Sequence, residues 1–163
     1  MQALVASGVV GVRYALGDII NQCATNPYGA RLDRHRVASY ATFGAMYGGG
    51  PGFLWFNVVA PYLSRTFAVK PLQLALLDAF VHCPLMYYPM FYCCRRLLIQ
   101  GDPAWFVLGM RDVRENFHKD MPMLCAFWVP VNTMIFRYTP LPYRMPCFAA
   151  CGLAWAILLS ATH

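Results

Sequence analysis

The chain has 163 residues, of which 59% are hydrophobic and only 12% are charged, and its mean hydropathy is +0.44. Soluble domains carry about 25% charged residues, so this composition excludes an ordinary soluble globular protein. The net charge of +6 comes from scattered lysines and arginines. Nucleic-acid-binding proteins present a basic stripe or a recognisable module. We therefore expect no nucleic-acid partner, and we expect membrane lipids to be the partners of the basic loops.

Apolar stretches recur along the whole chain. They lie near residues 3–22, 37–63, 72–94, 121–136 and 145–161. Each is close to the roughly 20 residues that a helix needs to cross a hydrocarbon core of about 30 Å. We predict an all-α fold, a polytopic membrane helical bundle of four to five spanning helices that fills a single membrane domain, residues 1–163. The N-terminus has the features of neither a secretory signal nor a transit peptide, so a mitochondrial address is expected to be internal.

The first stretch contains two charged residues, Arg13 and Asp18. A charge at mid-bilayer costs about 2.5–3.5 kcal/mol on insertion scales, so such residues are expected to pair or to face water. We expect Arg13 to pair with Asp18 or Asp78 across helices. The four buried ionisable candidates, Arg13, Asp18, Asp78 and His82, then form either a polar pathway or a buried ion pair that fixes helix register.

Small residues repeat at every fourth position in the first two stretches. The positions are Ala3, Ser7 and Gly11 in the first and Gly44, Gly48 and Gly52 in the second. This pattern lets membrane helices approach closely, so it predicts tight helix packing. Pro51 lies among the glycines, where a kink is expected. A phosphate-cradling loop is the alternative, but no predicted strand precedes the glycines and no lysine follows them.

The third stretch carries Asp78 and His82 one helical turn apart. His82 and its neighbour Cys83 could act as an acid–base or nucleophilic pair. No HExxH, GxSxG or two-carboxylate arrangement accompanies them, so we expect no enzymatic activity.

Seven cysteines lie mostly inside the apolar stretches: Cys23, Cys83, Cys93, Cys94, Cys125, Cys147 and Cys151. None forms a CxxC pair, and none lies near a histidine at a familiar zinc spacing. Apolar packing is the expected role of these side chains. We therefore expect no metal site, no cofactor and no disulfide scaffold.

Residues 104–119 differ in pattern from the apolar stretches. Apolar residues recur at 4-3-4 spacing, at Phe106, Met110, Val113 and Phe117. The other face carries Arg111, Asp112, Arg114, Glu115 and His118. We predict one amphipathic helix, which either lies in the membrane interface or packs on a partner.

The basic residues are unequally divided between the loops. Loops 1 and 3 hold eight, namely Arg31, Arg34, Arg36, Arg95, Arg96, Arg111, Arg114 and Lys119. Loops 2 and 4 hold four, namely Arg65, Lys70, Arg137 and Arg144. The positive-inside rule then assigns loops 1 and 3 to the side from which the protein inserts, which is the matrix for a mitochondrial inner membrane.

The stretch FWVPVNTMIFRYTPLPYR (127–144) combines interfacial aromatic residues, prolines and two arginines. We predict the end of one span, a rigid hairpin and the start of the next span. Pro130 is expected to kink or start a helix, and Pro140 and Pro142 to force an extended turn. Arg137 and Arg144 are expected to extend toward lipid headgroups.

The spacing W-x-P-V … F-R-Y-x-P-L-x-Y-R, with Trp155 eleven residues later and then Leu159–Ser160, closely resembles the C-terminal signature of the Mpv-17 / peroxisomal membrane protein (22 kDa class) family. The segment LGDIINQ (16–22) resembles that family's first-helix motif, and Asp78 and Pro84 have the family's spacing. The residues that match the motifs are Asp18, Pro51, Asp78, Trp128, Pro130, Phe136, Arg137, Pro140, Tyr143, Arg144 and Trp155.

The resemblance implies a small multi-helix protein of the mitochondrial inner membrane, with the peroxisomal membrane as the alternative location. Members are linked to solute-permeable channels and, in mitochondria, to maintenance of mitochondrial DNA. It therefore implies a non-enzymatic channel or solute pathway that supports mitochondrial metabolite homeostasis, acting alone, as a homo-oligomer or in a larger membrane complex.

Several positions depart from the family's pattern. Where the family places polar amides, this chain has Ala79, Ile135 and Ala156, and Leu124 stands at a fourth such position. Amides inside a membrane bundle either join helices by hydrogen bonds or line a wet path. Their replacement favours the alternative function, a structural or assembly subunit of a larger mitochondrial inner-membrane complex.

Overall fold

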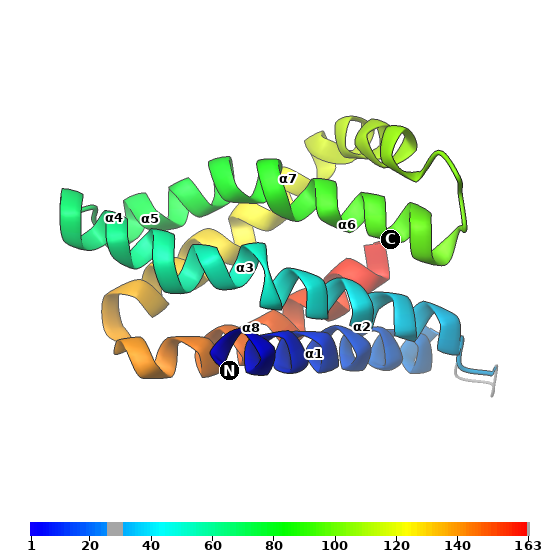
Figure 1. Cartoon of the computed structure of the whole chain (residues 1–163), viewed down its shortest axis with the longest axis horizontal. Coiled ribbons are helices and arrows are strands. Elements are labelled where there is room, and N and C mark those ends of the chain that lie inside the picture. The colour runs from blue at the N-terminus through cyan, green and yellow to red at the C-terminus, as the bar shows by residue number, and fades with distance from the viewer. Residues whose placement is uncertain (26–30, 163) are drawn as a thin grey trace.

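The structure is a computed structural model, and it describes residues 1–25 and 31–162. Within these ranges every regular element is a helix (Figure 1). Residues 26–30, which precede the arginines of loop 1, lie outside the described part. In chain order the elements are α1 (Gln2–Thr25), α2 (Arg34–Gly49), α3 (Pro51–Leu54), η1 (Trp55–Val59), α4 (Ala60–Phe67), α5 (Pro71–Leu77), η2 (Asp78–Tyr87), α6 (Tyr88–Cys94), η3 (Arg95–Ile99), α7 (Trp105–Tyr138) and α8 (Leu141–Thr162). Elements labelled η are π-helices, which have wider turns than α-helices.

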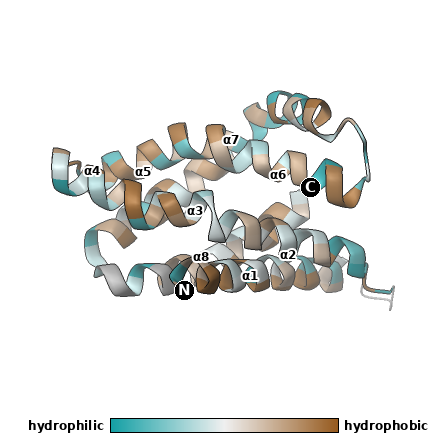
Figure 2. Cartoon of the chain, in the orientation of Figure 1, coloured by the Kyte–Doolittle hydropathy of each residue, from teal (hydrophilic) through white to brown (hydrophobic). Residues whose placement is uncertain are grey.

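Two helical runs in the described residues are long and apolar enough to cross a membrane. They are α1 and the continuous run Pro71–Ile99, and a shorter apolar helix covers Cys147–Thr162. Figure 2 shows hydrophobic residues along the helices and hydrophilic residues gathered toward the ends of the molecule. The all-α membrane fold is confirmed, whereas the total of four to five spanning helices stays a prediction.

Helices α1 and α2 pack closely because small residues face each other. A Cβ added at Gly44 would lie 2.7 Å from the backbone oxygen of Val10, so a larger residue fits there only if a helix shifts. The Ser7 hydroxyl donates to the backbone oxygen of Ala45 over 2.9 Å. The tight packing predicted from the repeat of small residues is confirmed for this pair of helices.

The second apolar stretch is interrupted where the kink was expected. Gly50 has φ −112° and ψ −109°, which separates α2 from α3. Pro51 then begins α3, at a position where its missing N–H leaves no helical hydrogen bond unmade. The kink predicted at Pro51 is confirmed.

Two of the π-helical segments occur beside prolines. Pro84 lies inside η2, and Pro61 follows η1. Proline lacks an N–H, and its ring collides with the preceding turn, so it interrupts the α-helical hydrogen-bond ladder. Wider turns keep the helix continuous at such points.

Residues 105–138 form one helix of 34 residues, α7. The sequence favoured an amphipathic helix followed by a separate span, and it favoured a kink or a helix start at Pro130. Instead, Pro122 and Pro130 both lie inside α7, which Figure 1 shows beginning at the upper right and running back through the bundle. Membrane helices tolerate proline when Ser or Thr side chains and neighbouring helices bond the freed carbonyls. The Thr133 hydroxyl donates to the backbone oxygen of Val129, the residue before Pro130, over 2.6 Å.

Most of the predicted apolar face in the first part of α7 is exposed, whereas Val113 is partly buried against the core. Phe106, Met110 and Phe117 are exposed. Asp112, on the other face, is buried and accepts hydrogen bonds from Nε and Nη2 of Arg96, each over 2.6 Å. An exposed apolar stripe and a partly buried ion pair on the other face are consistent with the predicted interfacial helix.

Aromatic residues form most of the core between α1, α2 and the run Pro71–Ile99. The Phe43 ring lies at its centre, with ring centroids 5.1–6.0 Å from those of Tyr14, Tyr47, Tyr87 and Phe91. The pairs with Tyr14, Tyr87 and Phe91 are edge-to-face and the pair with Tyr47 is stacked; such aromatic pairs contribute about 0.5–1.5 kcal/mol each beyond the burial of their area. A second cluster of Ala60, Leu74, Ile135, Phe136 and Phe148 joins α4, α5, α7 and α8.

Candidate functional site, a cavity between the helices

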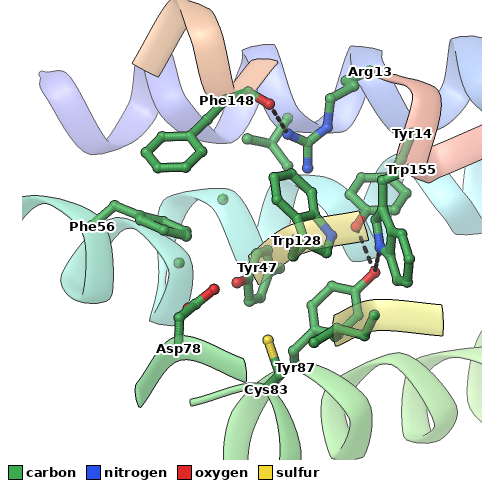
Figure 3. Close-up of a pocket in the computed structure, with 14 residues that line it drawn as sticks. Arg13, Tyr14, Tyr47, Phe56, Asp78, Cys83, Tyr87, Trp128, Phe148 and Trp155 are labelled. Atoms are coloured by element: carbon green, nitrogen blue, oxygen red, sulfur yellow. Dashed lines mark hydrogen bonds between the residues drawn. The ribbon is translucent and has the colours of Figure 1, made fainter. Parts of the chain in front are cut away.

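A cavity of about 60 Å³ lies between α1, α2, the run Pro71–Ile99, α7 and α8. A cavity needs a volume of about 10–15 Å³ to hold one water molecule, so this cavity has room for roughly four to six water molecules. Its walls are mostly aromatic and include Tyr14, Tyr47, Phe56, Trp128, Phe148 and Trp155. Arg13 and Asp78 are the charged residues that line it, and Figure 3 shows them on different sides of the cavity.

Arg13 extends from α1 toward α8 (Figure 3). Its Nη1 donates to the backbone oxygen of Phe148 over 3.2 Å. Its guanidinium carbon lies 5.0 Å from the centroid of the Tyr14 ring. Its Nε is buried and has no hydrogen-bond partner among the described residues. Gly152 makes room for this side chain, because a Cβ there would collide with the guanidinium. Arg13 is therefore a cation at the cavity wall with spare capacity to donate a hydrogen bond.

Asp78 is 3% exposed and is held from two sides. Nδ1 of His82 lies 2.8 Å from its Oδ1, and Nδ2 of Asn132 donates to its Oδ2 over 2.6 Å. Asp78 and His82, which the sequence places one helical turn apart, are therefore in direct contact. Asn132, on α7, was not predicted as a partner; it is the amide that this helix places opposite the acid.

The carboxylates expected to pair with Arg13 are both engaged elsewhere. Asp18 is 0% exposed, forms an ion pair with Nε of Arg36 at 2.9 Å, and accepts from the Ser160 hydroxyl over 2.7 Å. Asp78 pairs with His82 instead. In the described part of the chain no carboxylate lies within ion-pair distance of Arg13, so the predicted pairing is wrong. Five positions along an α-helix lie about 140° apart around its axis, which turns Asp18 away from the Arg13 side.

Asp18 consequently belongs to a junction of three helices and not to the cavity. Asn21 Nδ2 donates to the backbone oxygen and to the hydroxyl of Ser160, each over 3.0 Å. Nη2 of Arg36 donates to the same backbone oxygen over 2.8 Å. These bonds join α1, α2 and the C-terminal turn of α8. The polar residues of the first-helix motif therefore have a structural role here.

A hydrogen-bonded chain of aromatic side chains crosses the cavity wall. The hydroxyls of Tyr14 and Tyr87 are 2.8 Å apart, and Trp155 Nε1 donates to the Tyr87 oxygen over 2.8 Å (Figure 3). All three side chains are buried. The motif residue Trp155 thus fixes α8 to α1 and η2.

The remaining motif residues divide between the cavity, the core and the surface. Trp128 lines the cavity, and Phe136 is 6% exposed in the second core cluster. Pro130, Arg137, Pro140 and Tyr143 are exposed. The guanidinium of Arg137 lies over the Tyr138 ring at 5.2 Å, consistent with an interfacial position.

Arg144 is not directed toward headgroups. Its Nε donates to the backbone oxygen of Thr139 over 3.0 Å and its Nη2 to that of Phe136 over 3.2 Å. The last carbonyls of α7 have no partner within the helix, so Arg144 bonds them from the start of α8. The extended turn is also shorter than predicted, since Thr139 is extended before Pro140 and α8 begins at Leu141.

The replaced amide positions are all packed. Ala79, Leu124, Ile135 and Ala156 are buried, and a Cβ added at Gly17 would lie 2.6 Å from that of Ala156. An amide at position 156 would therefore not fit against α1 without a shift.

Some polar contacts of α7 were not predicted from the sequence. The Tyr92 hydroxyl donates to Oδ2 of Asp120 over 2.5 Å, and the Tyr88 hydroxyl donates to the backbone oxygen of Asp120 over 2.9 Å. Together with the ion pair of Arg96 and Asp112, they hold α7 against the run Pro71–Ile99. Asp112 and Asp120 lie eight residues apart, which places both carboxylates near one face of the helix. This spacing is the signal that the sequence offered for the two contacts.

Residues 107–160 match the model of the Mpv17 / PMP22 family. No curated protein and no solved structure matches the chain. The matched segment contains Trp128, Pro130, Phe136, Arg137, Pro140, Tyr143, Arg144 and Trp155, whereas Asp18, Pro51 and Asp78 precede it. The match and the all-α membrane fold support membership of this chain in the Mpv17 / PMP22 family.

Proposed function

We propose that this chain is a non-enzymatic membrane protein whose interhelical cavity is part of a pathway for small solutes. The observation that carries the proposal is the position of Arg13 and Asp78 on the walls of one cavity with room for water. Charged side chains within a membrane bundle are expensive, and those that face a cavity mark ion or solute pathways.

The cavity admits water or a small ion, because its volume is about 60 Å³. A larger metabolite passes only if the helices separate, so transport of such a solute requires a conformational change. Support of mitochondrial metabolite homeostasis is the proposed role. The proposed location is the mitochondrial inner membrane, with the peroxisomal membrane as the alternative. Immunofluorescence of the chain against markers of both organelles distinguishes these locations.

Flux through proteoliposomes tests the pathway. Vesicles containing the purified chain are loaded with solutes of graded size, and release is compared with that from protein-free vesicles. The informative variants are Arg13→Gln and Asp78→Asn. Their matched controls are Arg114→Gln, at an exposed position of α7, and Asp102→Asn, in the loop before α7. We expect wild-type vesicles and both controls to release small ions, and both cavity variants to release them at a different rate. Release equal to that of protein-free vesicles would contradict the proposal.

A structural or assembly subunit is the second candidate function. It is favoured by the packed residues at the replaced amide positions and by the exposed apolar stripe of Phe106, Met110 and Phe117. This stripe would bury against another subunit in such a complex. Native gel electrophoresis of mild detergent extracts tests it: co-migration with a large complex that is lost in Phe106→Ser supports assembly, and migration as a monomer argues against it.

A further inference from the structure

The wide turns of η2 bring three different side chains to one face of the helix. A π-helix bonds residue i to residue i+5, so Cys83 lies one turn after Asp78, and His82 lies beside it. One donor atom from each of Asp78, His82 and Cys83 lies within 4.8 Å of the other two. The spacing D-x-x-x-H-C is not a familiar zinc spacing, so no metal site was expected from the sequence.

These three side chains are buried and held in position. Asp78, His82 and Cys83 are 3%, 4% and 6% exposed. The His82 ring is stacked on the Trp55 ring, with centroids 4.7 Å apart and an interplanar angle of 2°. It is also stacked on Tyr47, at 5.9 Å and 27°. Fixed ring orientation and a bonded carboxylate are what metal-binding histidines and acids show in proteins.

Lone pairs outnumber hydrogen-bond donors around the cluster. The Asp78 carboxyl is buried, and in the described part of the chain it has no arginine or lysine in ion-pair contact. Nε2 of His82 and Oδ1 of Asn132 are both buried without a hydrogen-bond partner among the described residues. Each such group left unpaired costs about 1–3 kcal/mol. A bound cation would satisfy these two acceptor atoms and the Asp78 carboxyl together.

The geometry points to a binding site for a divalent transition-metal cation at Asp78, His82 and Cys83, with Zn²⁺ as the ion of matching chemistry. Carboxylate oxygen, imidazole nitrogen and thiolate sulfur are the donors that Zn²⁺ takes, at about 2.0–2.3 Å. Thiolate and imidazole favour it over Mg²⁺ and Ca²⁺, which prefer oxygen donors.

Metal binding at this site releases one proton, because the Cys83 thiol coordinates as the thiolate. Asp78 and Cys83 both line the cavity, so a water from the cavity can occupy a fourth position. Figure 3 shows their side chains on the same side of the cavity, near Tyr47. Bound metal would thus fix η2 beside Asn132 of α7. This inference does not depend on solute transport, since a packing subunit could carry the same site.

Cobalt spectroscopy of the full chain tests the site. The protein is purified in detergent without a polyhistidine tag, stripped with a chelator and titrated with Co²⁺ alone. We expect about one Co²⁺ per chain and a near-ultraviolet absorption band from thiolate-to-cobalt charge transfer, which Zn²⁺ abolishes by displacing the cobalt. The band should be lost in Cys83→Ser and retained in Cys94→Ser, a buried cysteine of α6 outside the cluster. Asn132→Ala should weaken Co²⁺ binding by about 10–100-fold, as loss of a bond to a metal ligand does.

Absence of the band in the wild-type chain would overturn the site and leave Asp78 and His82 as a hydrogen-bonded pair. A band that persists in Cys83→Ser would overturn it as well, because another thiol would then hold the cobalt. Far-ultraviolet circular dichroism of the metal-free variants verifies that they are folded. Flux through proteoliposomes is measured separately, so failure of metal binding is distinguishable from failure of the solute pathway.

Discussion

Arg13 and Arg36 both reach into the bundle, and their surroundings differ. Arg36 pairs with Asp18 at 2.9 Å, whereas Arg13 donates to a backbone oxygen and keeps a buried Nε without a partner. The sequence could single out Arg13 and Asp18, because charges are rare in apolar stretches. It could not pair them correctly, because Arg36 belongs to a basic segment that looked like part of a loop. Pairing depends on which helices become neighbours, and an isolated helical pattern does not contain that information.

The ion pair of Asp18 predicts a loss of stability on its removal. Asp18→Asn leaves Arg36 without a counter-charge, and it replaces one of the two oxygens that accept from Ser160 and Gln22 by an NH₂ group. We expect the free energy of unfolding to fall by about 1–3 kcal/mol. Thermal unfolding in detergent micelles measures this, with Asp102→Asn as the control that should remain near wild type. An unchanged melting temperature in Asp18→Asn would show that the pair contributes nothing to stability.

The bonds from Arg144 to the end of α7 predict a smaller effect. Arg144→Gln removes hydrogen bonds to the backbone oxygens of Phe136 and Thr139 and a positive charge near a helix C-terminus. We expect a loss of about 1 kcal/mol. Arg137→Gln, at an exposed position seven residues earlier, should change stability by less than about 0.5 kcal/mol. Equal effects in the two variants, measured by the same unfolding experiment, would contradict a capping role.

At the scale of elements, the positions of the helical runs were predictable and their internal form was not. The apolar stretches near 3–22, 72–94 and 145–161 coincide with α1, the run Pro71–Ile99 and α8. Hydrophobicity decides where a helix can be buried, so this level of organisation is visible in the sequence. The π-helical turns and the passage of α7 through two prolines depend on neighbouring helices. For this reason the convergence of Asp78, His82 and Cys83 could not be predicted from spacing.

The contact between α1 and α2 predicts a sharp difference between two glycines. A Cβ at Gly44 would meet the backbone oxygen of Val10 at 2.7 Å, whereas a Cβ at Gly8 would meet nothing within 4 Å. We expect Gly44→Ala to destabilise by about 1–3 kcal/mol through overpacking. Gly8→Ala should be neutral or stabilising by up to about 1 kcal/mol, because alanine favours helix. Chemical unfolding in mixed micelles compares them, and a stable Gly44→Ala would argue against close packing.

At the scale of the whole molecule, the basic loops are arranged by side. Figure 1 shows the end of α1, the start of α2 and the connection from η3 to α7 at one end of the bundle. The connections from α4 to α5 and from α7 to α8 lie at the other end. The loops counted as richer in arginine and lysine therefore share an end, as an orientation set by charge requires.

This arrangement predicts which sites reagents reach in an inner mitochondrial membrane. Cys23 is exposed near the end of α1, and Thr66 is exposed near the end of α4. In intact mitoplasts, a membrane-impermeant maleimide should label Thr66→Cys in a Cys23→Ser background and leave Cys23 of the wild type unlabelled. Detergent-opened samples serve as the control for reactivity. Labelling of Cys23 in intact mitoplasts would show that the protein has the opposite orientation.

We propose that Arg13 and Asp78 line a solute pathway, and the reversal potential in planar bilayers tests this proposal. Under a KCl gradient, loss of the Arg13 charge should reduce the permeability of the pathway to anions relative to cations. We therefore expect the reversal potential of Arg13→Gln to shift toward the K⁺ equilibrium potential, with Arg114→Gln unchanged from wild type. Discrete conductance with the same reversal potential in all three proteins would show that Arg13 does not line the pathway. No conductance from a folded wild-type chain would contradict the pathway itself and favour the assembly subunit.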